Sequence, residues 1–182
     1  DPVLSSFKEQ ISFVDGRFET GLPWKKGQKD FLLNNEKIAR ARLQQLSRQL
    51  NNKPDLKVRY NEVFAEMQAT GVIEIVDVKD TAAGPIFYMP HHPVVREDKI
   101  TTKIRPVFDA SAKGYNNVSL NDCMEVGPCL LASLSEILVR FRRWPVALTA
   151  DIEKAFHQIN VCPEDRDVHR ILVESDHGVD IM

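Results

Sequence analysis

The sequence lacks the features that mark a secreted, zinc-binding or membrane-spanning protein. Its three cysteines, Cys123, Cys129 and Cys162, are an odd number, and none lies at a two-residue spacing from another. This pattern argues against a disulfide framework and against a zinc knuckle. No apolar run approaches the roughly 18 residues that a membrane span needs, and no signal peptide opens the chain. We therefore expect an intracellular protein that does not enter a membrane.

Excess charge of one sign is also missing. The formal net charge is −2 over 182 residues, so an electrostatic signal for nucleic acid has to be local. Hydrophobic residues make up 43% and charged residues 27%, which fits one globular domain or one domain with an extension. No internal repeat or low-complexity tract is present. The abrupt ends, at Asp1 and at "DHGVDIM", suggest that the chain was cut from a longer protein.

Helical periodicity begins near residue 35. The stretch before it, residues 1–34, is poorly periodic and predicts an irregular lead-in, with short strands at most. Apolar residues then recur at near-helical spacing, at Ile38, Leu43, Leu46 and Leu50. Asn34 or Asn35 can cap this helix at its start. Pro54 suits the first turn of a second helix, and Gly71 suits the position just beyond its end.

The second half of the chain alternates extended segments with one amphipathic stretch. "VIEIV" (72–76) predicts a strand, and "IFYMPHHPVV" (86–95) and "KIRPVFDAS" (103–111) predict extended segments whose prolines favour sheet edges. Residues 130–144 predict a helix, because apolar residues recur at three and four along them. This order of elements indicates an α+β fold with a largely antiparallel sheet.

The stretch "VALTADIEKAF" (146–156) raises a question of its own. Its apolar start predicts a buried strand, yet the strand runs directly into Asp151. Burying an unpaired carboxylate is too costly. Asp151 therefore either caps the following turn or meets a cation.

A local basic segment precedes the predicted helix at 130–144. It contains Lys99, Lys103, Arg105 and Lys113. Lys103 and Arg105 are two residues apart, so on a strand their side chains project from the same face. Such a pair can bind phosphate, the arginine through a bidentate fork and the lysine as a point charge. The alternative is an ordinary solvated strand face.

Taken together and in this order, the blocks resemble a known family. "HHPV", "KIRPVFDAS", "SLND", "GP" and "ADIEKAFHQI" are similar to segments of the reverse transcriptase of BEL/Pao-type retrotransposons. "LPWK" and "NNEKIARARLQQL" are similar to the lead-in of that family. The resemblance extends over residues 13–172, which is nearly the whole chain.

The resemblance implies a truncated right-hand polymerase fold, made of fingers and palm, with an antiparallel palm sheet. Residues 1–34 would be an irregular lead-in and residues 35–84 a helical lead-in with a first strand. Residues 85–182 would be the fingers and palm fragment.

The resemblance also implies a metal site. "ADIEKAF" is similar to the first catalytic motif of the palm, in which Asp151 would bind two Mg²⁺ ions, or Mn²⁺ in their place. The backbone carbonyl of Ile152 would be an accessory ligand. Magnesium is usually held by one or two carboxylates and by substrate phosphates. Two such ions would stabilise charge on the attacking 3′-oxygen and on the leaving pyrophosphate.

Other residues acquire expected roles in the same way. Lys103 and Arg105 would bind the incoming nucleotide, and Phe156 would lie beneath its sugar and exclude a 2′-hydroxyl. Contacts to the template and primer are implied for Gln158, Arg140, Arg142 and Arg143. For the three arginines the alternative is a favourable position at the end of a helix. His91 and His92 suit local packing beside Pro93, or contact with nucleic acid.

One expected block of the family is missing from the sequence. Reverse transcriptases carry a second motif with an aromatic residue and two adjacent aspartates, and no such block occurs here. Asp176 and Asp180 lie in "ESDHGVDIM" without the aromatic or the adjacent acid, and the resemblance ends near Val173. We therefore expect that this chain alone does not polymerise DNA.

Three interpretations follow. The first is a fingers and palm fragment of an RNA-directed DNA polymerase, whose partners would be an RNA or DNA template–primer, deoxynucleoside triphosphates and the rest of the pol polyprotein. Its location would be the cytoplasm or virus-like particles. The second is a non-catalytic remnant that binds nucleic acid or protein. The third is an unstable leftover, because a sheet edge would stay exposed where the chain stops.

Overall fold

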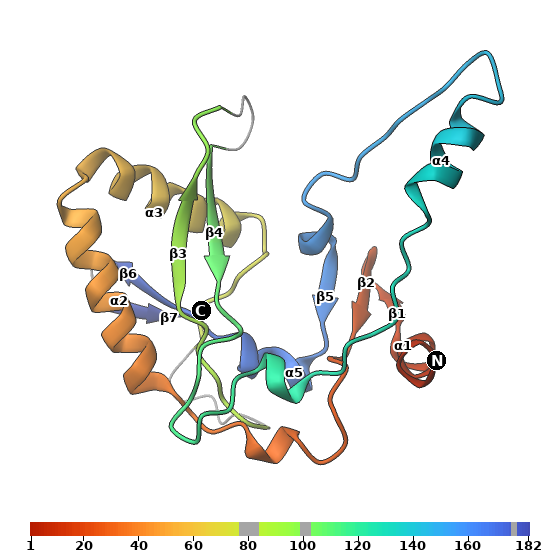
Figure 1. The fold of residues 1–182 in the computed structure, drawn as a ribbon. Helices are drawn as coiled ribbons and strands as arrows, with labels where there is room; N and C mark the ends of the chain where they lie inside the picture. Colours follow the sequence, from red (N-terminus) through yellow and green to blue (C-terminus); the bar gives the residue numbers. More distant parts are fainter. Residues whose placement is uncertain (77–83, 99–102, 176–177) are drawn as a thin grey trace.

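The computed structural model describes residues 1–76, 84–98, 103–175 and 178–182, and it has a mixed α+β fold, as predicted (Figure 1). The helices are α1 (Pro2–Gln10), α2 (Glu36–Asn51), α3 (Pro54–Ala69), α4 (Leu134–Phe141) and α5 (Pro163–Arg166). The strands are β1 (Ser12–Val14), β2 (Arg17–Thr20), β3 (His91–Val95), β4 (Ile104–Phe108), β5 (Ile159–Val161), β6 (Leu172–Ser175) and β7 (Gly178–Ile181). Single 3₁₀ turns lie at Lys29–Phe31, Asn121–Cys123, Ala155–Gln158 and Asp167–His169.

The strands form three small sheets. Three pairs are antiparallel, β1–β2, β3–β4 and β6–β7, while β5 joins β2 in parallel. In the β3–β4 pair, Pro93 lies opposite Pro106. A two-stranded sheet consists of edge strands alone, so both prolines are on edge strands, as the sequence predicts.

The two predicted helices of the lead-in are confirmed as α2 and α3. Pro54 is at the first turn of α3, and Gly71, with φ +68°, follows its last turn. The N–H of Gly71 donates to the carbonyl of Gln68 and the N–H of Val72 to that of Met67, at 3.0 and 2.8 Å. These two bonds close a Schellman motif. Val72 therefore belongs to the end of the helix. The prediction of a strand at residues 72–76 is wrong, because these residues form no strand.

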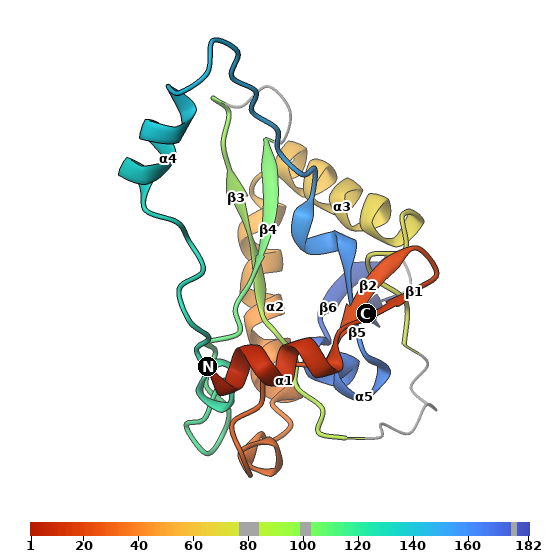
Figure 2. The same cartoon turned by 90° about the vertical axis from the view of Figure 1, so that its right-hand side faces the viewer.

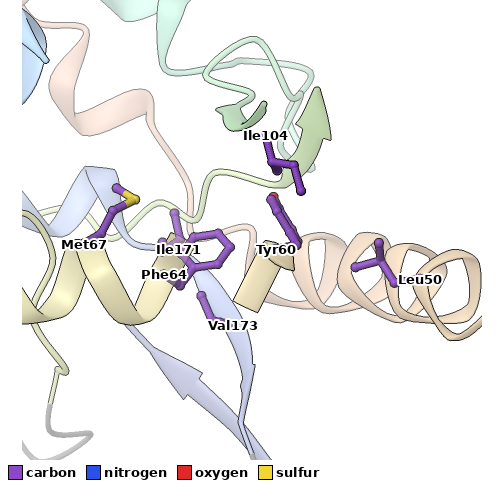
Figure 3. Packing of buried hydrophobic residues seen from close by; sticks show 7 residues of the cluster. All are labelled: Leu50, Tyr60, Phe64, Met67, Ile104, Ile171 and Val173. Atoms are coloured by element: carbon purple, nitrogen blue, oxygen red, sulfur yellow. The ribbon is translucent and has the colours of Figure 1, made fainter. Parts of the chain in front are cut away.

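The largest buried cluster joins α2 and α3 to β4 and β6 (Figure 3). Its members are Leu50, Tyr60, Phe64, Met67, Ile104, Ile171 and Val173. Phe64 meets Tyr60 edge to face at 5.1 Å between ring centroids. Because α3 contributes three of the seven side chains, it is the element on which the β3–β4 hairpin is seated.

The two asparagines before α2, Asn34 and Asn35, have different roles. Asn34 accepts a hydrogen bond from the N–H of Glu36 at 2.9 Å, which confirms one of the two predicted capping residues. The Asn35 side chain is fully buried and makes no capping bond. Its amide donates to the carbonyl of Tyr88 and accepts from the N–H of Tyr88, at 2.8 and 2.7 Å. This two-bond pairing fixes the segment before β3 against α2.

The N-terminal region is more regular than predicted. Asp1 accepts hydrogen bonds from the N–H groups of Val3 and Leu4, and Pro2 occupies the first turn of α1. An aspartate cap followed by proline is a helix-start signal that the prediction of an irregular lead-in overlooked. Asp15 and Gly16, with φ 49° and 81°, form the turn between β1 and β2. A tight turn with two positive φ angles favours an Asp-Gly pair.

Residues 125–158, here called the arm, differ from the rest of the molecule. Figures 1 and 2 show α4 standing apart from the other elements, with extended chain on both sides. The predicted helix at 130–144 is shorter, because Ser133 precedes its first turn and Pro145 disfavours helix at Trp144. The buried strand predicted before Asp151 is absent: residues 146–150 are irregular, and Leu148 is 89% exposed.

Within the described part of the chain, no helix has the length and apolar character needed to cross a membrane.

Candidate functional site

The β3–β4 hairpin has two different faces. Directly paired residues of an antiparallel ladder point to the same side. The pairs His91–Phe108 and Val95–Ile104 therefore share one face, and Val94–Arg105 lies on the other. Ile104 is buried and Arg105 is exposed, in agreement with this alternation.

The inner face is fixed by a half-buried histidine. His91 lies against the rings of Phe64 and Phe108, with centroids 4.9 and 6.3 Å away. Its Nε2 is 2.8 Å from the carbonyl oxygen of Leu172, and its Nδ1 is 2.7 Å from the hydroxyl of Tyr60. A carbonyl can only accept, so Nε2 carries the proton and Tyr60 donates to Nδ1. Burial lowers the pKa of His91 and raises that of Tyr60, which keeps both groups neutral.

Basic side chains collect on the outer face. Lys103 directly precedes β4, and the N–H of Arg96 donates to its carbonyl at 2.7 Å, which continues the ladder by one step. By this register Arg96, Lys103 and Arg105 lie on the side opposite Ile104, together with His92. We call these four residues the basic face. All four are exposed.

The cations of the basic face are available to a ligand. Among the described residues, none of Arg96, Lys103 and Arg105 makes an ion pair. Three positive charges on one short hairpin attract a polyanion, and an arginine fork matches phosphate geometry. The sequence pattern indicates Lys103 and Arg105 but not Arg96 or the outward side of His92, because only strand pairing brings these two residues to the same face.

Asp151 is not at the end of a buried strand, because the strand predicted before it is absent. Its carboxylate is exposed, and its Oδ1 accepts a hydrogen bond from the N–H of Ile152 at 2.9 Å. This is a local turn contact rather than the tip of a buried strand. Of the two alternatives left open by the sequence, the geometry resembles the local cap, and Asp151 makes no ion pair with another described residue.

The chain after Asp151 is held against α3. Lys154, with φ 49°, places its ammonium group 2.6 Å from a carboxylate oxygen of Glu66. The hydrogen bond and charge of each partner lower the pKa of Glu66 and raise that of Lys154. Both side chains are exposed, so the pair adds little stability. The pair instead positions the chain after Asp151 on α3, the helix against which the β3–β4 hairpin also packs.

The remaining predicted site residues are dispersed. The ring of Phe156 is 92% exposed, and the Gln158 amide donates to the carbonyl of Glu153 at 3.3 Å. Arg140, Arg142 and Arg143 lie at the end of α4, and the Arg143 guanidinium is 5.4 Å from the ring centroid of Trp144. The structure thus brings Lys103 and Arg105 together. Among the described residues, no hydrogen bond or ion pair links them to Asp151.

The donor set around Asp151 is too small for a metal site. No group of three or more histidine, cysteine, aspartate or glutamate side chains in the described ranges is arranged to hold a metal ion. Asp151 offers one carboxylate, and Ile152 adds a neutral carbonyl. Asp180 lies in β7 opposite Val173, and Asp176 is outside the described residues. Magnesium binding at Asp151 therefore stays a prediction, and it would need ligands beyond the described side chains of this chain.

A second polar cluster surrounds Asp165, and no local sequence pattern predicts it. The buried carboxylate of Asp165 accepts hydrogen bonds from the Leu22 N–H, the Trp24 indole N–H and the Lys29 ammonium, at 2.8, 2.9 and 2.7 Å. Burial alone would raise the pKa of Asp165, but these three donors together lower it. These three donors come from residues 22–29, so the cluster fastens the lead-in to α5. The cluster could not be predicted from the sequence, because Asp165 and its donors are 136 to 143 positions apart.

Comparisons with known proteins do not place the chain in a family. No family model, no curated protein and no solved structure gives a significant match to it.

Proposed function

We propose that this chain is a fingers and palm fragment of an RNA-directed DNA polymerase from a retrotransposon of BEL/Pao type. The ancestral reaction would be transfer of a nucleotide to the 3′-hydroxyl of a primer. The proposal rests on the resemblance of the sequence blocks "HHPV", "KIRPVFDAS" and "ADIEKAFHQI" and on the basic face. Its finer elements, the right-hand fold and the palm sheet, belong to the proposal as well.

The basic face is the observation that carries the proposal. Arg96, Lys103 and Arg105 project from a hairpin whose other side is locked by His91 and Phe108 against α3. A rigid backing means that little backbone freedom is lost when a phosphate binds. In the proposed function, Arg105 and Lys103 hold the triphosphate or the phosphate backbone of a template–primer, and Arg96 extends the same surface.

The proposed fragment is not expected to polymerise by itself. Asp151 is the one carboxylate that the first catalytic motif contributes, and the sequence has no aspartate pair of the second motif. Without further anionic ligands the exposed Asp151 cannot concentrate two divalent ions against their hydration. A primer-extension assay with Mg²⁺ or Mn²⁺ should give no product, and any metal-dependent extension would contradict this expectation.

A second candidate function is a non-catalytic remnant that binds nucleic acid. The observation in its favour is the local, cap-like contact of Asp151 with the N–H of Ile152, together with the lack of any metal-binding group of three side chains among the described residues. The two candidates differ in what the basic face binds. A polymerase piece should bind a deoxynucleoside triphosphate and prefer it to the ribonucleotide through Phe156. A remnant should bind the nucleic-acid backbone with no such preference.

The test replaces the two predicted cations of the basic face. Lys103→Ala/Arg105→Ala should weaken binding of a labelled primer–template, measured by fluorescence anisotropy, by about tenfold or more. It should also reduce the slope of the logarithm of the binding constant against the logarithm of salt concentration by about two. Lys37→Ala/Arg42→Ala is the matched control, because it removes the same charge from exposed positions on α2. Equal losses in the two variants would show non-specific attraction and contradict the proposal.

Competition between deoxy- and ribonucleoside triphosphates separates the two candidates in the same assay. In the polymerase interpretation, the preference for the deoxynucleotide disappears in Phe156→Ala, while binding of the primer–template remains. If neither nucleotide competes and the primer–template still binds through Lys103 and Arg105, the remnant is favoured.

A further inference from the structure

Helix α4 has an apolar side without a partner. Its eight residues place a stripe on one side, at the i, i+3, i+4 and i+7 positions Leu134, Ile137, Leu138 and Phe141. All four side chains are exposed. Ile137 and Phe141 line a shallow groove together with residues of the chain that follows, among them Trp144 and Leu148. Isolated helices shorter than about 12–15 residues are marginal in water, so α4 needs a docking surface.

A second uncovered apolar surface lies on the three-stranded sheet. Phe13 is paired with Phe18, and Phe18 with Ile159, so the three side chains form one row across β1, β2 and β5 on the same face. We call them the apolar row. They are 65%, 52% and 47% exposed, and none belongs to a buried cluster. The rings of Phe13 and Phe18 already contact each other edge to face at 5.1 Å.

The two surfaces match in size, and the segments that carry them have opposite net charge. An eight-residue helix is about 12 Å long, and the outer strands of a three-stranded sheet are about 10 Å apart. Residues 1–20, which include β1 and β2, carry four acidic and two basic side chains. The segment from Leu134 to Arg143 carries three arginines and one glutamate. A helix on a sheet is also the simplest way to cover two apolar faces.

Both ends of the arm are attached close to this sheet. At its start, the N–H of Glu125 donates to the carbonyl of Pro23 at 2.7 Å, and Gly127 lies beside Val3 of α1, the helix that leads into β1. At its end the arm continues directly into β5, a strand of the sheet. Two such tethers give α4 a high effective concentration at the sheet of its own chain, which favours that sheet over the sheet of a second copy.

We propose that the arm is a strap that closes: α4 docks its apolar stripe on the apolar row of the same chain. The open form in Figures 1 and 2 and the closed form differ by rotation of the extended segments on either side of α4. Closure buries two apolar surfaces that are exposed in the open form. It also restrains the segment that carries Asp151, because that segment joins α4 to β5. The proposal does not depend on the polymerase assignment.

Disulfide trapping tests the closed form. Phe18→Cys/Leu138→Cys, in a Cys129→Ser background, should form an intrachain bond under mild oxidation, identified by peptide mass mapping. The matched control is Phe18→Cys/Val139→Cys, because Val139 lies on the side of α4 away from the stripe. Disulfides need Cα atoms within about 7 Å, so the control should react about tenfold more slowly or not at all.

Two results of the trapping experiment would overturn the proposal. Equal rates for Leu138→Cys and Val139→Cys would show that α4 samples the sheet at random. A disulfide found between an isotope-labelled and an unlabelled chain would show that the occupant is the α4 of a second copy.

Hydrogen exchange on the unaltered chain gives a readout that does not depend on folding of a variant. If the strap closes, the amides of residues 138–141 should exchange at least about tenfold more slowly than in an unstructured peptide, and Phe18→Asp should remove most of this protection. Exchange of these amides at the peptide rate in the unaltered chain would refute closure outright.

Discussion

Phe64 and Phe156 have the same side chain and opposite surroundings. Phe64, on α3, is 2% exposed and contacts the rings of Tyr60, His91 and Phe108. Phe156, in the arm, is 92% exposed. The arm is rich in apolar residues, and by composition alone it would be assigned to the interior. An apolar side chain is therefore buried only where a second surface packs against it. For α3 this surface is the β3–β4 hairpin, and the arm has no such surface in the open form.

The same contrast holds for charged residues. Asp165 is buried and satisfied by three donors, while Asp151 is exposed and bonded to its neighbour's backbone. A carboxylate can be buried only where donors converge on it. In this chain the convergence occurs between the lead-in and α5. Around Asp151, where the sequence predicts the most demanding chemistry, the hydrogen bond found among the described residues comes from the neighbouring N–H of Ile152.

The largest expected effect compares the two phenylalanines directly. Phe64→Ala should reduce the free energy of unfolding by about 3–5 kcal/mol, because it leaves a cavity among Tyr60, His91 and Phe108. Phe156→Ala should change it by no more than about 0.5 kcal/mol, since a solvated ring loses no packing. Urea denaturation followed by far-ultraviolet circular dichroism measures both. Similar losses would mean that Phe156 is packed in solution and that the contrast between the regions is false.

A smaller effect is expected from the buried carboxylate. Asp165→Asn keeps the shape of the side chain but removes the charge that Lys29 neutralises, and it turns an amide N–H₂ toward existing donors. We expect a loss of about 2–3 kcal/mol in the same denaturation experiment, reduced because Lys29 is one-third exposed. Since the folded-state pKa is lowered, this stability is present above the unfolded pKa and is lost as pH falls through the folded-state value.

Asp122→Asn is the control for this substitution. Asp122 also accepts hydrogen bonds, from Lys113 and from Ser119, but it is exposed. Exposed ion pairs contribute little, so the midpoint of denaturation should hardly move. A loss as large as that of Asp165→Asn would show that the number of hydrogen bonds decides the effect and that burial does not.

Local patterns in the sequence predicted the two helices of the lead-in and the extended segments that contain β3 and β4. The spacing of apolar residues and the positions of Pro54 and Gly71 predict α2 and α3, because these signals act within one helix. The extended character of the prolines and β-branched residues around His91 and Arg105 predicts β3 and β4. Placing Lys103 and Arg105 on one face required nothing more than the two-residue period of a strand.

Other features depend on contacts between distant residues and could not be predicted. Residues 146–150 have the composition of a buried strand, yet a strand needs a neighbour, and the described chain provides none there. His91 was expected to pack locally beside Pro93, whereas it joins Tyr60 of α3 to Leu172 of β6. The hydrogen bonds between Asn35 and Tyr88 could not be predicted either, because nothing in the sequence near one residue points to the other.

The smallest expected effect concerns the pH dependence of the packed region. The pKa of His91 is lowered in the folded chain, mainly by burial, with the charge of His92 adding to it and the hydrogen bond to Leu172 opposing it. Its neutral form donates to Leu172 and accepts from Tyr60, so protonation removes the acceptor that the buried Tyr60 hydroxyl uses. A lowered folded-state pKa means that stability is intact above the unfolded value near 6.5 and is lost as pH falls below it.

Urea denaturation between pH 7 and pH 5 should therefore show a loss of stability that His91→Gln reduces. One proton limits the contribution of His91 to about 1.4 kcal/mol per pH unit. Burial also lowers the pKa values of His157 and His169, so the difference in slope between the unaltered chain and the variant isolates His91. His92→Gln, at an exposed position on the same strand, should leave most of the slope unchanged. If His91→Gln and His92→Gln had equal slopes, the neutral hydrogen-bonded His91 would not be what holds the hairpin on α3, and the basic face would lose its rigid backing.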